Sequence, residues 1–214
     1  MIAGAVDVIG FLALGGLFTA HITGNLVILA AHYITGGFGE IAPLLSAPVF
    51  VVVLGVITVM VIRKTIPFIR RALLVIQALL LASFLVFGVW FGPFADPNSR
   101  MAVFVGMLGV AAMATQNAVV KLALPGHPTT AVMSMNAAQL AIDLAMLARC
   151  LFKPINVSEI RSRADVTTLA VLGFVLGVVA GAILEIHFGL WSLILPSLLA
   201  GLAIPLSESW TAAS

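Results

Sequence analysis

The chain has 214 residues, of which 62% are hydrophobic and only 8% are charged, and its formal net charge is +2. Soluble domains of this size carry about 25% charged residues, so this chain has too few charges to cover a surface exposed to water. The composition predicts a single membrane-embedded domain, and the small net charge gives no indication of a nucleic-acid partner.

The apolar runs are long and continuous, which predicts an all-α protein that crosses the bilayer several times. A hydrocarbon core of about 30 Å needs roughly 20 apolar residues in a helix. Leucine and alanine dominate the runs, and the alternation that a membrane β-barrel requires is absent. Eight apolar segments can be marked: 1–18, 23–36, 42–62, 72–92, 101–124, 131–149, 166–186 and 190–206.

The first segment, 1–18, carries a carboxylate, Asp7, in its middle. An ionisable side chain within a span is costly and is a functional candidate by default; the alternative is a neutral, hydrogen-bonded aspartic acid. No basic stretch precedes this run and no small-residue cleavage site ends it, so we expect no cleavable signal peptide. The chain begins almost inside the run, which leaves a clipped or misassigned start open.

A polar break, TAHITGN, follows at 19–25. A helix that begins inside the membrane leaves its first N–H groups unpaired, and hydroxyl and amide side chains can cap them. A glycine lets a backbone or ligand approach closely, and the positive end of the helix dipole favours an anion. The alternative is ordinary hydrogen bonding between helices. The candidate binding residues of this break are Thr19, His21, Thr23, Gly24 and Asn25.

Two basic loops constrain how many segments cross. One carries Arg63, Lys64, Arg70 and Arg71, and the other carries Arg149, Lys153, Arg161 and Arg163. The positive-inside rule places both loops in the cytoplasm, but three segments lie between them, and three crossings would separate them. We therefore interpret the most polar of the three, 131–149, and its short counterpart 23–36 as re-entrant half-helices. Six full spans remain, with both termini cytoplasmic.

The second half of the chain resembles the first. Three matches support a repeat: Asp7 with Asn117, TAHITGN at 19–25 with TAVMSMN at 130–136, and VLGV at 53–56 with VLGV at 175–178. The candidates in the second half are Gln116, Asn117, Thr130, Ser134 and Asn136. Two copies with three crossings each, approximately 1–92 and 101–206, would be inverted, which is typical of secondary transporters with a site at the midplane. The alternative, eight crossings in a parallel repeat, violates the charge rule.

Two features outside the polar breaks also predict a functional group or a packing surface. Asp143 is a further candidate carboxylate near the cytoplasmic end of its segment, beside Arg149. Gly173, Gly177 and Gly181 form a small-residue stripe that predicts helix packing, either within the chain or at a dimer face.

The stretches GAVDVIGFLALGGLFTAHITGN and ATQNAVVKLALPGHPTT resemble the YoaK-like family of small bacterial membrane proteins over nearly the whole chain. The family pattern is an aspartate in the first span, then F-T-x-x-x-T-G-N, with a Q-N motif and a paired threonine in the second half. The resemblance implies a membrane protein with a repeat, but the family has no assigned function and supplies no substrate. The chain departs from the pattern at Ser134 and Met135, where members often carry T-G, and it has fewer residues before the aspartate.

No metalloprotease, hydrolase or nucleotide-binding motif and no Cys/His cluster occurs, so we expect no enzyme, cofactor or metal site. We interpret the chain as a small secondary carrier of the bacterial inner membrane for a polar or anionic solute, with proton or sodium coupling through Asp7. At 22.3 kDa it is small for a complete carrier, which favours a homodimer. The alternatives are a channel, a non-transporting assembly or regulatory partner, and, least favoured, an intramembrane enzyme built on Asp7 and Asp143.

Overall fold

The computed structural model describes residues 1–35, 41–124, 126–129, 133–150 and 157–209, and this part of the chain is helical without a strand. A π-helical turn (Val119–Ala123) extends α5, and a 3-10 turn (Gly189–Leu193) joins α7 to α8. The helices are α1 (Ile2–Ala13), α2 (Ile22–Thr35), α3 (Ile41–Val61), α4 (Ile66–Phe91), α5 (Arg100–Ala118), α6 (Met133–Cys150), α7 (Val157–Phe188) and α8 (Ile194–Ser209).

Four stretches of the described chain are long and apolar enough to cross a membrane: Ile41–Val61, Ile66–Phe91, Arg100–Ala123 and Val157–Ser207. The last of these contains α7 and most of α8. Large apolar side chains also cover the outside, and Val59 and Ile186 are 76% and 77% exposed. An apolar exterior suits lipid rather than water, so the predicted all-helical, polytopic membrane fold is confirmed.

α1 is shorter than the predicted segment 1–18. It has 12 residues and ends at Ala13, so it extends about 18 Å at 1.5 Å per residue. The helix stops before Gly15 and Gly16, whose φ angles of 63° and 88° lie in the left-handed region, where glycine carries no steric penalty. The predicted end at residue 18 is therefore wrong, and a non-helical segment connects α1 to α2.

The two basic loops are also shorter than predicted, because helices continue into them. α4 begins at Ile66 after Thr65, with a proline in its first turn, a position that proline favours. Arg70 and Arg71 therefore lie on α4 rather than in a loop. α7 likewise begins at Val157 and has 32 residues, about 48 Å, so its first turns extend beyond a hydrocarbon core of about 30 Å.

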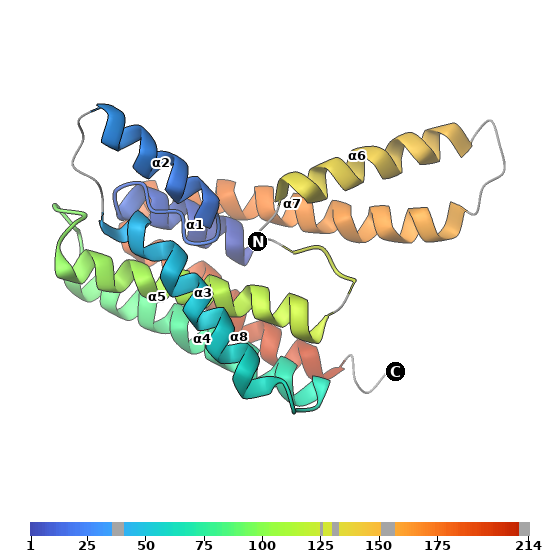
Figure 1. The fold of residues 1–214 in the computed structure, drawn as a ribbon, viewed down its shortest axis with the longest axis horizontal. Coiled ribbons are helices and arrows are strands. Elements are labelled where there is room, and N and C mark those ends of the chain that lie inside the picture. The colour runs from blue at the N-terminus through green and yellow to red at the C-terminus, as the bar shows by residue number, and fades with distance from the viewer. Residues whose placement is uncertain (36–40, 125, 130–132, 151–156, 210–214) are drawn as a thin grey trace.

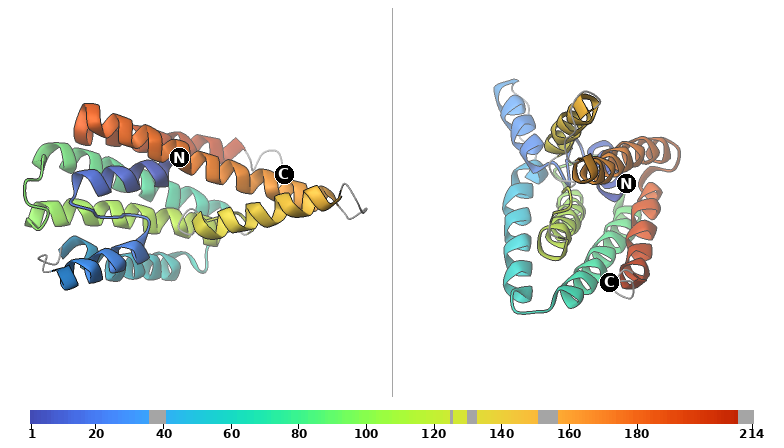
Figure 2. Two further views of the ribbon diagram at one scale, coloured as in Figure 1. Left: turned by 90° about the horizontal axis from the view of Figure 1, so that it is seen from above. Right: turned by 90° about the vertical axis from the view of Figure 1, so that its right-hand side faces the viewer.

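The helices pack in pairs that match between the two halves of the chain. α1 packs on α7 as α5 packs on α3, α2 packs on α3 as α6 packs on α7, and α4 packs on both α5 and α8. Figure 1 shows that α2 and α6 begin near the middle of the long axis and run toward opposite ends. Seen along that axis, α5 lies between α3 and α4 (Figure 2, right), and more than half of its residues are buried.

The glycine stripe of α7 holds α1. A Cβ atom at Gly177 would overlap the Met1 carbonyl, and one at Gly181 would lie 2.9 Å from the Cα of Ala5. A Cβ at Gly4 would in turn overlap the carbonyl of Phe174. The two backbones therefore touch, which confirms the predicted helix packing. Because α1 covers the stripe, the alternative that it forms a dimer face is wrong.

Candidate functional site

Asp7 anchors the first break to α1. Its side chain is 4% exposed, and its Oδ1 accepts hydrogen bonds from the Ala20 N–H at 2.8 Å and from the Thr19 hydroxyl at 3.3 Å. Oδ2 lies 2.5 Å from Nδ1 of His21. Gly10 permits this close approach, since a Cβ there would lie 2.9 Å from the Thr19 methyl group. The carboxylate thus supplies the polar partners that a non-helical segment lacks in an apolar environment.

Asn25, in the first turn of α2, makes hydrogen bonds to the same break. Its Oδ1 accepts from the Phe18 N–H at 2.9 Å, and its Nδ2 donates to the Phe18 carbonyl at 2.7 Å. Nδ2 also donates to the Ser46 hydroxyl on α3 at 2.8 Å, and that hydroxyl donates to the Pro43 carbonyl at 2.7 Å. Asn25 is fully buried, so this one side chain fixes the start of α2 to both the break and α3.

Four of the predicted residues line one pocket of about 480 Å³ at the start of α2. They are Asp7, His21, Thr23 and Gly24, and apolar side chains of α1, the break and α7 complete the wall. The His21 ring stands edge-on to Phe18 and Phe174, with centroid distances of 6.1 and 5.5 Å. The pocket therefore presents a small polar patch within aromatic walls, as small-molecule sites do.

Asn136 occupies a similar position in the second break. Its Nδ2 donates to the Thr129 carbonyl at 2.8 Å, a carbonyl seven residues earlier, as the Phe18 carbonyl is for Asn25. Ser134 is exposed in the first turn of α6. Thr130 lies outside the described residues, so its predicted role is neither supported nor opposed. The corresponding asparagines thus make corresponding bonds.

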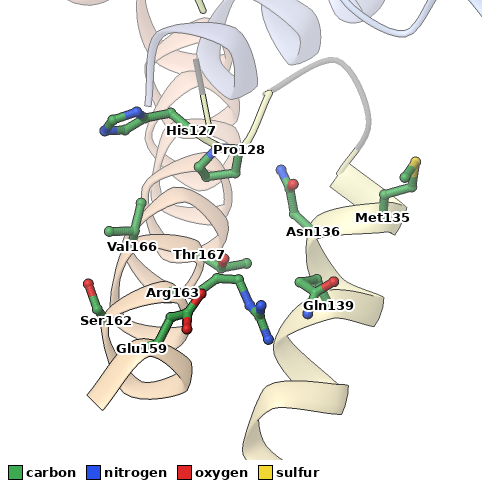
Figure 3. A pocket seen from close by; sticks show the side chains of 11 residues that line it. His127, Pro128, Met135, Asn136, Gln139, Glu159, Ser162, Arg163, Val166 and Thr167 are labelled. Carbon is green, nitrogen blue, oxygen red and sulfur yellow. The ribbon is translucent and has the colours of Figure 1, made fainter. Parts of the chain in front are cut away.

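A second pocket, of about 720 Å³, lies between α6 and α7 (Figure 3). Asn136 and Gln139 line it from α6, and Arg163 reaches toward them from α7 (Figure 3). Behind it, Asp143 is fully buried and pairs with Arg163, with Nη2–Oδ1 at 2.5 Å and Nε–Oδ2 at 3.0 Å. Gln139 Nε2 donates to the same carboxylate at 2.9 Å. The sequence drew attention to Arg149 beside Asp143 and named Arg163 only as a residue of the second basic loop, not as the partner of Asp143.

Gln116 and Asn117 lie in neither of these two pockets. The Gln116 Oε1 accepts from Nε2 of Gln77 on α4 at 2.9 Å. Asn117 donates to the Met113 carbonyl within its own helix at 2.9 Å. Sequence reasoning missed Gln77, because a single glutamine in an apolar run indicates no partner. Of the predicted residues, Asp7, His21, Thr23 and Gly24 therefore line one pocket, Asn136 lines the other, and Gln116 makes a contact between helices.

Removing Arg163 from its pair with Asp143 should measurably weaken the packing of α6 on α7. Arg163→Ala should loosen α6 from α7, because it leaves the buried Asp143 carboxylate without its cation. Hydrogen–deuterium exchange of the α6 amides should become faster. Arg161→Ala, an exposed arginine on the same helix, is the matched control and should leave α6 unchanged. Equal exchange in the two variants would contradict a role of the pair in holding α6.

Comparison with known proteins identifies a family. The model of a family described as "Protein of unknown function (DUF1275)" matches residues 1–205. No curated protein and no solved structure matches the chain. The match agrees with the expectation of an uncharacterised family, and it supplies no substrate.

Proposed function

The chain belongs to the DUF1275 family of proteins of unknown function, and from its structure we propose that it is a small secondary carrier of the bacterial inner membrane. Its cargo is a small polar or anionic solute. The protein acts by moving this solute across the bilayer, not by chemical conversion, and its partners are the lipid bilayer, the solute and a coupling ion. A homodimer is the proposed assembly, formed through a surface other than the glycine stripe of α7.

One observation carries this proposal: two broken helices start near the middle of the molecule and run toward opposite ends (Figure 1). Equivalent asparagines, Asn25 and Asn136, bond to carbonyls seven residues before them. The helix pairings also match when the halves are exchanged. These features support an inverted repeat with halves of approximately 1–92 and 101–206. Secondary transporters place their solute between such broken helices.

The distribution of charge supports a defined orientation. Gly88 in the last turn of α4 and Gly92 just after that helix line a pocket together with Glu185 and Phe188 of α7, so α4 and α7 end on the same side. The starts of both helices, which carry the basic residues, therefore lie toward the opposite side (Figure 1). The positive-inside rule makes that side cytoplasmic. α1 runs away from it and α8 runs toward it, so both termini are proposed to be cytoplasmic.

The groups at the first pocket favour an acceptor-rich solute. Thr19 and Asn25 are fully buried, and their polar atoms bond within the chain. The residues left to contact a solute are His21, Thr23 and Gly24 at the start of α2. Helix N-terminal N–H groups and a hydroxyl donate to carboxylate or phosphate oxygens. We therefore assign Thr19 and Asn25 to positioning, and the pocket residues to binding.

A transport assay tests the proposal. A thermal-shift screen of the purified protein against small polar and anionic solutes provides the cargo, and uptake is then measured in liposomes. Uptake should saturate, should follow an imposed gradient, and should fall to background in Asp7→Asn, because the anchor of the break and its charge are lost together. Asp96→Asn, at an exposed aspartate in the α4–α5 turn, is the matched control and should transport normally.

The other outcomes of this assay would overturn the carrier in distinct ways. Unitary conductance across a planar bilayer would make the protein a channel. Turnover of a solute in detergent, without any gradient, would make it an enzyme. Normal uptake by a folded Asp7→Asn variant would remove Asp7 from the mechanism.

A further inference from the structure

Asp7 and His21 form a hydrogen-bonded pair whose geometry fixes which nitrogen of the neutral His21 ring carries the proton. Oδ2 of Asp7 lies 2.5 Å from Nδ1 of His21, and Oδ1 is occupied by the Ala20 N–H and the Thr19 hydroxyl. A carboxylate surrounded by donors is an acceptor, so the His21 proton in the neutral ring sits on Nδ1. Nε2 then carries a lone pair rather than a proton. Within the described part of the chain, Nε2 makes no hydrogen bond.

His21, whose Nε2 has no hydrogen-bond partner in the described part of the chain, lines the pocket. The His21 side chain is 30% exposed, and it lines the 480 Å³ cavity beside Thr23 and Gly24. The aromatic rings of Phe18 and Phe174 flank it at 6.1 and 5.5 Å. Ring edges offer Nε2 no conventional acceptor, so a solute or water is its natural partner.

No other charge in the pocket wall can compensate for a change on this pair. The titratable side chains that line the described pocket are Asp7 from α1 and His21 from the break. The residues that face it from α7, Phe174 and Val178, are uncharged, as are Thr23 and Gly24 of α2. The nearest other charged group on α1 is the Met1 amino group, two turns from Asp7. The pair therefore carries a net negative charge when His21 is neutral and none when it is protonated.

The net charge of the Asp7–His21 pair and the protonation state of Nε2 make anion binding depend on protonation of His21. Neutral His21 presents its Nε2 lone pair, which repels an anionic oxygen, and the pair's net charge repels it further. Protonation places a hydrogen on Nε2, turns it into a donor toward the pocket and removes the net charge, while Nδ1–H stays on Asp7. An anionic group and a proton thus enter together. Closing apolar walls over the anion and the proton together then buries less net charge than closing over the anion alone.

We propose that His21, held by Asp7, takes up one proton on Nε2 with each anionic group that binds, so the carrier is a proton–anion symporter. This inference rests on the proposed transport function and selects the coupling ion. Sodium fits the site poorly, because hard cations prefer several free oxygen ligands. Here both Asp7 oxygens face donors and the remaining group is an imidazole.

The first experiment measures the protonation of the His21 ring directly. Protein labelled with ¹⁵N-histidine is placed in nanodiscs, and the ring nitrogens are followed by NMR from pH 5 to 9. The His21 signals are those lost in His21→Gln; if that variant does not fold, single replacements of the other histidines assign them by elimination. His187→Gln, at an exposed histidine at the end of α7, is the matched control and should retain them. His21 should pass from the Nδ1–H form to the doubly protonated form.

Two further measurements separate the parts of the proposal. Acetate and inorganic phosphate are added as anion probes, and at least one should move the His21 titration midpoint to higher pH, because a bound anion favours the protonated ring. Asp7→Asn should move the midpoint to lower pH, because the carboxylate that stabilises the protonated ring is lost. A ring that keeps one protonation state over the whole range, or a midpoint that neither probe moves, would overturn proton–anion coupling.

Transport then distinguishes this inference from the function on which it rests. Liposomes containing a pH-sensitive dye should show lumen acidification when the solute found in the screen enters, in sodium-free buffer. Solute entry without acidification would overturn the coupling while the carrier stands. Failure of every solute to enter, with the NMR titration and its anion response intact, would overturn the carrier and leave the proton–anion site.

Discussion

Asn25→Leu is expected to lower the free energy of unfolding by about 2–6 kcal/mol, because it strips two backbone groups of their partners at about 1–3 kcal/mol each. These groups are the N–H and the carbonyl of Phe18. In an apolar environment neither group finds water to replace the amide. Leucine has the same number and branching of side-chain heavy atoms as asparagine, so the loss reports hydrogen bonding rather than a cavity. The start of α2 should detach from the break.

Unfolding in mixed micelles, followed by circular dichroism, measures this loss. Ser46→Ala is the graded control: it removes the bond from Asn25 Nδ2 to the Ser46 hydroxyl and the bond from that hydroxyl to the Pro43 carbonyl, and it should cost about 1 kcal/mol for each bond. Asn25 would still bond to Phe18 in that variant. Equal effects of the two substitutions, or no effect of Asn25→Leu, would show that the Phe18 backbone does not depend on this side chain.

Gly177→Leu should have the second large effect, a loss of about 3 kcal/mol or more, since overpacking is most costly where backbone atoms cannot move aside. A Cβ at this position would overlap the Met1 carbonyl, and a leucine adds further atoms in the same direction. α1 should then separate from α7. Asp7 is carried on α1, so the pocket at the first break should be lost with it. Solute binding and thermal stability should therefore fall together.

Gly55→Leu is the matched control for this substitution. Gly55 lies within α3, and a Cβ there would meet no atom within 4 Å. The change should therefore shift stability by no more than about 1 kcal/mol, in the favourable direction given by helix propensity. A similar loss in both variants would mean that any leucine in place of a glycine disturbs the fold. A stable, solute-binding Gly177→Leu protein would contradict the contact between α1 and α7.

Local chemistry made several features predictable. Continuous apolar runs with few charges are compatible only with helices in a membrane, and the helices are found close to the predicted segments. A break before α2 was predictable because hydroxyl, amide and glycine residues cluster at 19–25, although the non-helical segment begins earlier, after Ala13, and α2 begins at Ile22. The helix ends at the basic loops were placed less well. Proline at the start of α4 and the polar first turns of α7 form helix as readily as loop, and hydropathy does not separate the two.

The candidate site was also only partly predictable from the sequence. Asp7 and Asn25 were singled out from the sequence, because polar groups in an apolar run must have partners. Their partners were not predictable. Asp7 bonds to Ala20 and His21, which lie 13 and 14 residues later, and this requires the chain to fold back at Gly15 and Gly16. Arg163 lies 20 residues from Asp143 and on a different helix.

From the amino-acid sequence alone it follows that this protein is helical, that it lies in a membrane, and where polar residues break its helices. The folded arrangement was needed to show which polar groups meet, that the glycine stripe of α7 receives α1, and that five of the predicted residues line two separate pockets. This difference arises because a membrane helix is apolar on every side. Hydropathy therefore states that a helix is buried in lipid or protein, but not which of its faces contacts which neighbour.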